Sequence, residues 1–229
     1  MTSTRLRAAG LALWGLVLLR AASDGRLALL LRGVFHPLVS LAGIVLLVLA
    51  VAMLLPLRQR STPGGPVRRG DWLTLAASAL IALLLILVPP NPSFADLAQQ
   101  RPGDDTAEAE LSFVLPPAQR SLTDWVRLLR SQADPRLFSG EPALISGFVL
   151  PRDGGPPVLA RLLVRCCLAD ATPIGLAVRW PSDRPPPKRD QWLQVEGVMA
   201  VQAGPQGEEL VLLPRRIQPI QRPQRPLEP

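Results

Sequence analysis

The chain has 229 residues, a mean hydropathy of +0.24 and a formal net charge of +7 at pH 7. The apolar residues concentrate before Pro90, while the remainder has mixed polarity and many prolines, which excludes a single water-soluble domain. Arginine supplies nearly all of the positive charge, since Lys188 is the only lysine. The only two cysteines, Cys166 and Cys167, are adjacent, so a framework of separated disulfides is excluded.

Three hydrophobic segments precede the mixed-polarity part and predict membrane-spanning helices. The second and third segments, Leu38 to Leu57 and Trp72 to Pro90, contain no charged residue and are long enough to cross the hydrocarbon layer of roughly 30 Å. The first, Ala8 to Ser23, has only twelve uncharged residues before Arg20. A tilted helix with Arg20 reaching the interface fits it better than a cleaved signal peptide, because hydrophobic chain follows. We expect an α-helical anchor of three spans over residues 1–90.

The arginines near these segments predict the orientation in the membrane, because positively charged loops stay in the cytoplasm. Two clusters mark one side: Arg5, Arg7, Arg58, Arg60, Arg68 and Arg69. A smaller group lies on the other side and counts against this orientation: Arg20, Arg26 and Arg32. We expect a bacterial inner-membrane protein whose C-terminal domain lies outside the cytoplasm.

The C-terminal part is expected to be a soluble, mostly-β domain over residues 111–221, with a linker at 91–110 and a tail at 222–229. The linker is rich in Pro, Gly, Asp, Gln and Glu and has no apolar period. At Ser121 a capping-box pattern with Asp124 predicts a helix. One face of this helix is apolar: Leu122, Trp125, Leu128 and Leu129.

Five short apolar runs separated by Pro/Gly-rich breaks predict strands. They are Ala143 to Leu150, Val158 to Cys167, Ile174 to Trp180, Trp192 to Val201 and Leu210 to Ile220. Five strands at this spacing are typical of a small OB-like barrel, although a small β-sandwich fits the same pattern. Gly147 and Gly197 lie inside strands and could mark the bends that a barrel needs.

The run Cys166-Cys167-Leu168-Ala169-Asp170 is the strongest candidate for chemistry. If Arg161 and Arg165 face solvent, strand alternation places Cys167 outside and Cys166 in the core, so the thiols would be separated and stay reduced. Both thiols could be buried hydrophobes, or they could bind zinc or another soft metal together with Asp170. Two sulfurs and one carboxylate leave a tetrahedral site one ligand short. Asp170 could instead only close a turn.

The other candidate residues are weaker. His36, the only histidine, lies where the second span begins; it is an interfacial residue or a polar group at a membrane path or partner contact. Trp125, Trp180 and Trp192 are expected in the core. No His-based triad, phosphate loop, carboxylate pair or nucleophile elbow occurs in the sequence, so we expect no enzyme.

Several short motifs occur along the chain in this order: Gly25-Arg26-Leu27, His36-Pro37, Gly147-Phe148-Val149, Ala160-Arg161, Arg165 to Ala171, and Trp192 to Gly197. With them the chain resembles the YcgQ-like family of bacterial proteins over nearly its whole length, most specifically in the Cys-Cys-x-Ala-Asp-Ala motif. The resemblance implies a subunit of a two-component permease whose partner is a larger polytopic membrane protein. Residues 59–70 contain no histidine, unlike a histidine-rich stretch in some members, which weakens a metal-transport function.

Three functions follow as hypotheses. The first is an accessory permease subunit in contact with the lipid bilayer and a polytopic partner, because three spans are too few for an alternating-access transporter. The second is a membrane-tethered OB-like module that binds a thiol or metal ligand without a permease. Nucleic-acid binding is the third, and an extracytoplasmic domain argues against it.

Overall fold

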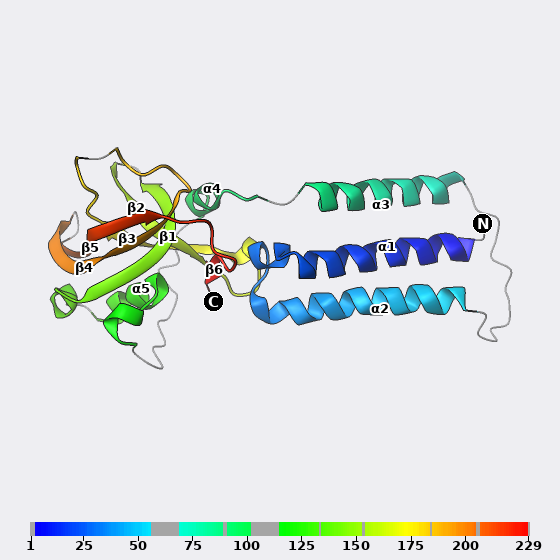
Figure 1. The fold of residues 1–229 in the computed structure, drawn as a ribbon, viewed down its shortest axis with the longest axis horizontal. Coiled ribbons are helices and arrows are strands. Elements are labelled where there is room, and N and C mark those ends of the chain that lie inside the picture. Colours follow the sequence, from blue (N-terminus) through cyan, green and yellow to red (C-terminus); the bar gives the residue numbers. More distant parts are fainter. Residues whose placement is uncertain are drawn as a thin grey trace. The chain divides into compact units, whose positions relative to one another are not determined.

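The computed structural model describes residues 3–55, 69–88, 91–101, 115–132, 134–152, 154–183, 185–204 and 207–228. The chain forms two compact units, Met1–Asn91 and Pro92–Pro229, each of which is described by itself (Figure 1). The expected ends of two spans at Leu57 and Pro90, and residues 102–110 of the expected linker, lie outside the described residues.

The first unit contains three α-helices: α1 (Ser3–Ser23), α2 (His36–Leu54) and α3 (Arg69–Leu87). Each is long and apolar enough to cross a membrane, by length and composition. The expectation of three apolar helices is confirmed, and the first begins earlier than its hydrophobic segment indicated. Two short 3-10 helices, η1 (Arg26–Leu29) and η2 (Gly33–Phe35), connect α1 to α2.

Close backbone contact and polar bonds hold these helices together. A Cβ atom on Gly15 of α1 would lie 2.9 Å from the carbonyl oxygen of Gly43 in α2, so two glycines allow the backbones to approach. Trp14 Nε1 donates a hydrogen bond of 2.7 Å to Ser78 Oγ of α3. The guanidinium of Arg26 donates to the carbonyl oxygens of Leu85 and Ile86 in the last turn of α3, where a helix has no partners of its own.

The second unit is mostly β. Its strands are β1 (Pro142–Arg152), β2 (Gly155–Leu163), β3 (Thr172–Val178), β4 (Trp192–Gly204), β5 (Gly207–Pro219) and β6 (Leu227–Glu228). They form one sheet in the order β1-β4-β5-β3-β2-β6, and β1 also pairs with β2. The pairings therefore run from β1 through β4, β5, β3 and β2 back to β1. All pairs among these five strands are antiparallel except β3 with β5.

Two glycines inside these strands occupy crowded positions. β1 pairs with β4 up to Phe148 and with β2 from Phe148 onwards, and a Cβ on the preceding Gly147 would lie 2.6 Å from Ala160 O. Glu196 of β4 is paired with Arg216 but Gly197 with Pro214, so β5 has an extra residue there. This irregularity is a β-bulge, a common cause of strand bending. Gly147 and Gly197, which were expected to mark bends, are therefore both positions where another backbone comes close.

Helix α5 (Leu122–Ser131) covers one core of the mostly-β unit. Its capping box is present: Ser121 Oγ accepts from Asp124 N at 3.2 Å, and Asp124 Oδ2 accepts from Ser121 N at 2.9 Å. Leu122, Trp125 and Leu128 are buried against the strands, as the pattern indicated. Two 3-10 helices flank α5, η3 (Pro117–Gln119) and η4 (Pro135–Phe138).

A second core surrounds α4 (Phe94–Gln99), a helix that lies where the sequence predicted a linker. Phe94 is buried between Phe148 and Trp192, with ring centroids 5.7 and 5.9 Å away. Asp190 Oδ1 accepts the amide of Ala95 at 2.7 Å, near the N-terminus of α4. The linker expectation was wrong for this segment, because contacts with distant strands stabilise a helix too short for a periodic pattern.

Candidate functional site

The two cysteines lie in a turn after β2 and not on a strand. β2 ends at Leu163, and η5 (Leu168–Asp170) follows the cysteines. The expected strand to Cys167 was therefore too long, and the expected alternation was wrong. Cys166 is exposed and Cys167 is partly buried, while Arg161, expected in solvent, is only 7% exposed.

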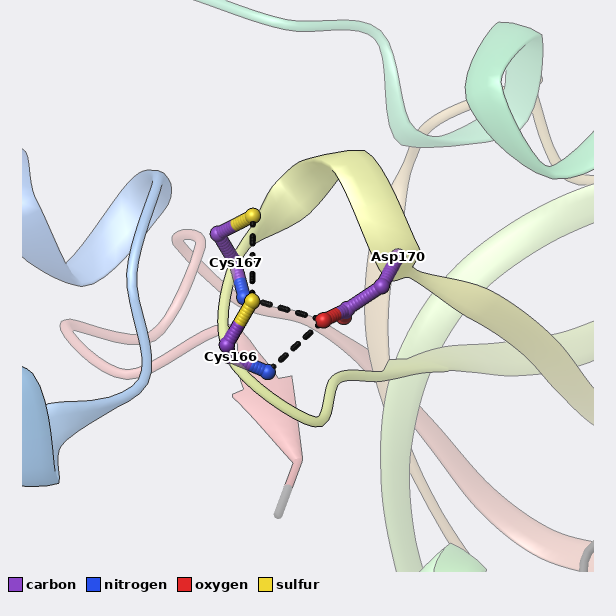
Figure 2. Close-up of side chains that lie close together, drawn as sticks. All are labelled: Cys166, Cys167 and Asp170. Atoms are coloured by element: carbon purple, nitrogen blue, oxygen red, sulfur yellow. Dashed lines mark hydrogen bonds between the residues drawn. The ribbon is translucent and has the colours of Figure 1, made fainter.

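Asp170 explains why the strand ends. Its Oδ1 accepts a hydrogen bond from Arg165 N at 3.0 Å, and its Oδ2 accepts from Cys166 N at 2.8 Å and from Cys167 N at 3.4 Å. These three amides are therefore bonded to a side chain and cannot extend a strand ladder. Asp170 closes the turn, and the same carboxylate also faces the Cys166 thiol (Figure 2).

The turn places the two sulfur atoms side by side. Cys166 Sγ lies 3.4 Å from Cys167 Sγ, and the possible ligand atoms of both cysteines and Asp170 all lie within 4.8 Å of one another. Two thiolates at 2.3 Å from a tetrahedral zinc ion would be roughly 3.8 Å apart. The three side chains can therefore reach one small soft cation with little movement. His36 is not part of this group.

The charge state of the turn follows from these contacts. The hydrogen bond to Asp170, and after it the one with Cys167, raise the pKa of Cys166 to about 12. Burial alone would raise the pKa of Asp170, but hydrogen bonds from the Cys166 thiol and the backbone amides lower it overall. At neutral pH the turn thus has a charged carboxylate beside a protonated thiol, which is a poor nucleophile. A bound cation would favour the thiolate instead.

We predict that Asp170→Asn makes Cys166 more reactive toward iodoacetamide at pH 8. The thiolate is the reacting form, and loss of the carboxylate moves the pKa of Cys166 down toward its ordinary value, so the alkylation rate should rise about tenfold or more. Tandem mass spectrometry locates the label on Cys166. Asp183→Asn removes the same charge from an exposed loop residue and should leave the rate unchanged. Equal rates in the wild type and Asp170→Asn would contradict the prediction.

Arg101 supports the turn through two hydrogen bonds. Its Nη1 donates to the carbonyl oxygens of Leu168 at 2.8 Å and Ala171 at 2.7 Å, the residues on either side of Ala169 and Asp170. Arg101 follows α4, in the segment predicted to be a linker. The sequence contained no signal for its role, because the contact joins residues far apart in the chain.

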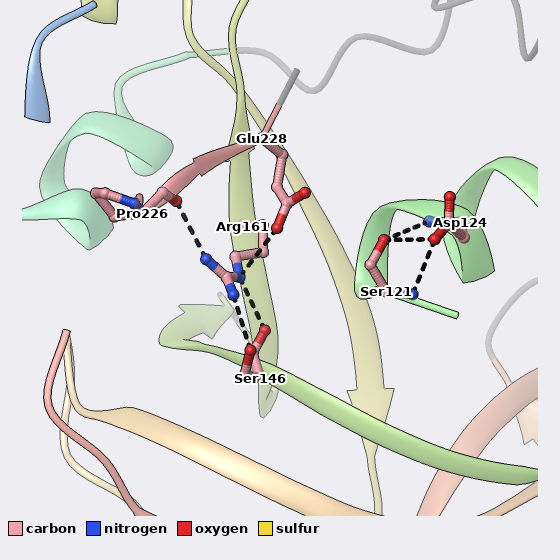
Figure 3. Close-up of polar contacts among 6 residues, drawn as sticks. All are labelled: Ser121, Asp124, Ser146, Arg161, Pro226 and Glu228. Carbon is pink, nitrogen blue, oxygen red and sulfur yellow. Dashed lines mark hydrogen bonds and ion pairs between the residues drawn. The ribbon is translucent and has the colours of Figure 1, made fainter. Parts of the chain in front are cut away.

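Arg161 supports the strand that leads into the turn (Figure 3). Its guanidinium donates to Ser146 O and Ser146 Oγ at 2.9 and 2.8 Å, and to Pro226 O at 3.3 Å. It lies 3.6 Å from Glu228 Oε1 and over the Trp192 ring at 5.0 Å. Burial lowers the pKa of Arg161. The negative charge of Glu228 acts in the other direction but is the smaller effect. Arg161 thereby attaches β6, in the segment expected to be a tail, to the edge of β2.

The structure also places His36 and the three tryptophans that were expected in the core. His36 is the first residue of α2, and its Nε2 lies 3.2 Å from Leu31 O. Trp125 and Trp192 are buried, as expected. Trp180 is partly buried, and its Nε1 donates to Pro157 O at 2.6 Å.

The net positive charge belongs entirely to the first unit. Residues 1–91 contain nine arginines and two aspartates, whereas residues 92–229 contain sixteen basic and sixteen acidic residues. A domain with no net charge has no overall attraction for a phosphate backbone, the main source of nucleic-acid affinity.

The described residues thus combine three helices that are long and apolar enough to span a membrane with a separate, mostly-β unit that contains a thiol–carboxylate turn. Residues 121–227, somewhat less than half of the chain, match the family model described as the DUF1980 C-terminal domain, a YcgQ-like family. The match includes the cysteine turn. No curated protein and no solved structure matches the chain.

Proposed function

We propose that the chain is an accessory subunit of a two-component membrane permease, and that it is not an enzyme. The observation that supports this most is that the described residues combine three apolar helices with a domain that has a turn of closely spaced ligand atoms. Transporters of the alternating-access type are generally built from paired repeats of several helices. A polytopic partner would supply the transport path, and the mostly-β domain would contact the partner or a ligand.

We further propose that the mostly-β domain is an OB-like barrel. The circuit of pairings through β1, β4, β5, β3 and β2 supports this, because it leaves none of these five strands at a free edge. The bulge at Gly197 and the change of partner at Phe148 also support it, because bulges and changes of partner accompany strand bending in small barrels. The cysteine turn would then lie in the connection from β2 to β3.

We also propose that this domain lies outside the cytoplasm of a bacterial inner membrane. The support is the cluster of arginines near the starts of α1 and α3 and between α2 and α3. Arg26 argued against this orientation in the sequence. Because it bonds to the last turn of α3 and forms an ion pair of 2.8 Å with Asp24, it is not a free positive charge.

A membrane-tethered binding module is the second candidate function. It is favoured by a cavity of about 380 Å³ beside Trp180, whose walls include Pro185, Pro186, Pro187 and Leu193. A tethered module should still function when its three helices are exchanged for an unrelated anchor, whereas a permease subunit should fail.

Affinity purification in mild detergent, followed by mass spectrometry, tests the permease assignment. We expect a stable complex with a polytopic membrane protein. Recovery of the chain alone, from cells in which a neighbouring permease gene is expressed, would exclude it.

Fusions of alkaline phosphatase and of a fluorescent protein to the C-terminus test the orientation, since the phosphatase is active only outside the cytoplasm. A fluorescent fusion with an inactive phosphatase would reverse the topology.

A further inference from the structure

The cavity of about 380 Å³ in the mostly-β unit lies where the connection from β3 to β4 passes the last residues of β5. Its volume falls in the range of small-molecule sites, roughly 300 to 1,000 Å³. Two strand residues line it: Leu193 of β4, which is 2% exposed, and Ile217 of β5, which is partly buried. Trp180 and a run of prolines line it from the connection, so most of the wall is apolar.

The apolar walls of this cavity are rigid. Half of the lining residues are prolines, namely Pro181, Pro219 and the run Pro185 to Pro187. A proline has a fixed φ and no side-chain rotamer freedom to lose on binding. Trp180 Nε1 donates a hydrogen bond of 2.6 Å to Pro157 O, so the one polar group of Trp180 is already bonded and only its ring is available to a ligand. Flat, preorganised walls of this kind favour an aromatic ring as the ligand's apolar part.

The polar groups of the cavity are hydrogen-bond donors, and they lie together. The ammonium of Lys188 makes no hydrogen bond or ion pair with the part of the chain that the structure describes. Gln191 Oε1 accepts a hydrogen bond of 3.0 Å from Lys188 N, which leaves the NH2 group of Gln191 to donate to a ligand. Of the described residues that line the cavity, none is acidic. A ligand should therefore combine an aromatic ring with a negative charge.

We propose that the cavity binds small aromatic carboxylates, with the ring against Trp180 and the prolines and the carboxylate on Lys188 and Gln191. Charge selects the anion, because a hydrogen bond from an ammonium to a carboxylate is stronger than one to a neutral amide. Lys188 is exposed, so this gain is moderate and should shrink as the salt concentration rises. The inference goes beyond the proposed permease function and names a ligand class for the second candidate function. Its test needs neither a partner nor transport, so its failure would leave the permease assignment unaffected.

Saturation-transfer NMR of the full chain in lipid nanodiscs, with 3-phenylpropionate as the probe, tests the proposal. Nanodiscs avoid detergent, whose apolar tails would compete for the cavity, and empty nanodiscs measure uptake by the lipid. We expect saturable binding with a Kd of about a millimolar, as is usual for so small a ligand. 3-Phenylpropionamide and 3-phenylpropylamine should bind about fivefold to tenfold more weakly. Equal affinity for the carboxylate and the amide, or no binding beyond that of empty nanodiscs, would overturn the proposal.

Variants of Lys188 separate this site from a general attraction of the domain for anions. Lys188→Gln should weaken phenylpropionate binding about fivefold to tenfold and leave phenylpropionamide binding unchanged, so that the preference for the carboxylate is lost. Lys188→Arg keeps the positive charge and should keep the preference. Arg215→Gln removes the same charge from an exposed residue of β5 outside the lining and should bind both ligands like the wild type. Equal losses in Lys188→Gln and Arg215→Gln would refute the site.

Trp180→Ala tests the apolar wall. It should weaken binding of the carboxylate and of the amide by the same factor, because the ring of Trp180 contacts the part that the two ligands share. Thermal unfolding shows whether this variant is folded, since it also loses the bond to Pro157 O. If the folded variant binds both ligands like the wild type, the site is not this cavity. If it does not fold, the Lys188 variants decide the proposal.

Discussion

Gly197→Ala is expected to lower the free energy of unfolding of the mostly-β unit by about 4 kcal/mol or more. A Cβ at this position would lie 2.0 Å from the carbonyl oxygen of Leu213 and 3.1 Å from Pro214 Cα. Both obstacles belong to the backbone of β5, so no side-chain rotation can relieve the overlap. The bulge that holds the two strands together would have to open. Thermal unfolding of the full chain in detergent, followed by near-ultraviolet circular dichroism, measures the loss.

Gly155→Ala is the matched control for this change. Gly155 also lies in a strand, β2, but nothing lies within 4 Å of the Cβ that alanine would add. Its effect should be within about 0.5 kcal/mol. If Gly197→Ala unfolds at the same temperature as Gly155→Ala, the close approach of β4 and β5 at the bulge is not a constraint of the fold.

The purified chain is expected to bind zinc weakly, and the complex with its permease partner to bind it more tightly. The turn offers two sulfurs and one carboxylate, whereas a closed tetrahedral zinc site has four protein ligands. Replacing both Cys166 and Cys167 by serine should weaken binding at least about a hundredfold, because losing supporting groups alone costs up to that factor. Affinity should also fall as pH falls, because the proton on Cys166 competes with the metal. Isothermal titration calorimetry of the chain and of the complex measures both effects.

The Asp170→Asn variant separates metal binding from simple packing of the thiols. An amide keeps the shape of the side chain but removes a charged ligand, which weakens zinc binding, while the lower pKa of Cys166 in this variant reduces proton competition. The affinity of Asp170→Asn for zinc should therefore depend less on pH than that of the wild type. If the double serine variant folds, assembles with its partner and functions normally, the thiols serve only packing. The reason for expecting reduced thiols, separation on a strand, does not hold, because the sulfur atoms lie 3.4 Å apart. A loss of two daltons from the peptide with both cysteines, under non-reducing conditions, would show a vicinal disulfide and exclude zinc binding by two thiolates.

The elements that could be predicted are those whose signal is local. The apolar helices follow from composition over 20-residue windows, and the helix after Ser121 follows from its capping box and apolar face. The five main strands follow from apolar runs between proline- and glycine-rich breaks. Gly147 and Gly197 stood out in the sequence as possible bends, whereas the close backbone approach that the structure shows there depends on strands distant in the chain.

The errors have a common physical cause, which is stabilisation by groups distant in the sequence or by a side chain. α4 has six residues, and its first turn is held by Asp190, which the chain reaches only after β3. Arg161 is buried because Ser146, Pro226 and Glu228 surround it. The alternation of Cys166 and Cys167 fails because the Asp170 side chain takes the amides that a strand would use. A pattern of polar and apolar residues contains none of these contacts.

The attachment of β6 through Arg161 also bears on the order of events during synthesis. Arg161 is made early, with β2, but its counter-charge on Glu228 and the carbonyl oxygen of Pro226 come after β3, β4 and β5. A guanidinium buried without its partners is strongly unfavourable. Until β6 has emerged, water should therefore keep access to this edge of β2, the strand that leads into the cysteine turn. The nascent domain would thus stay open at this edge through most of its translation, and close it as a late step of maturation.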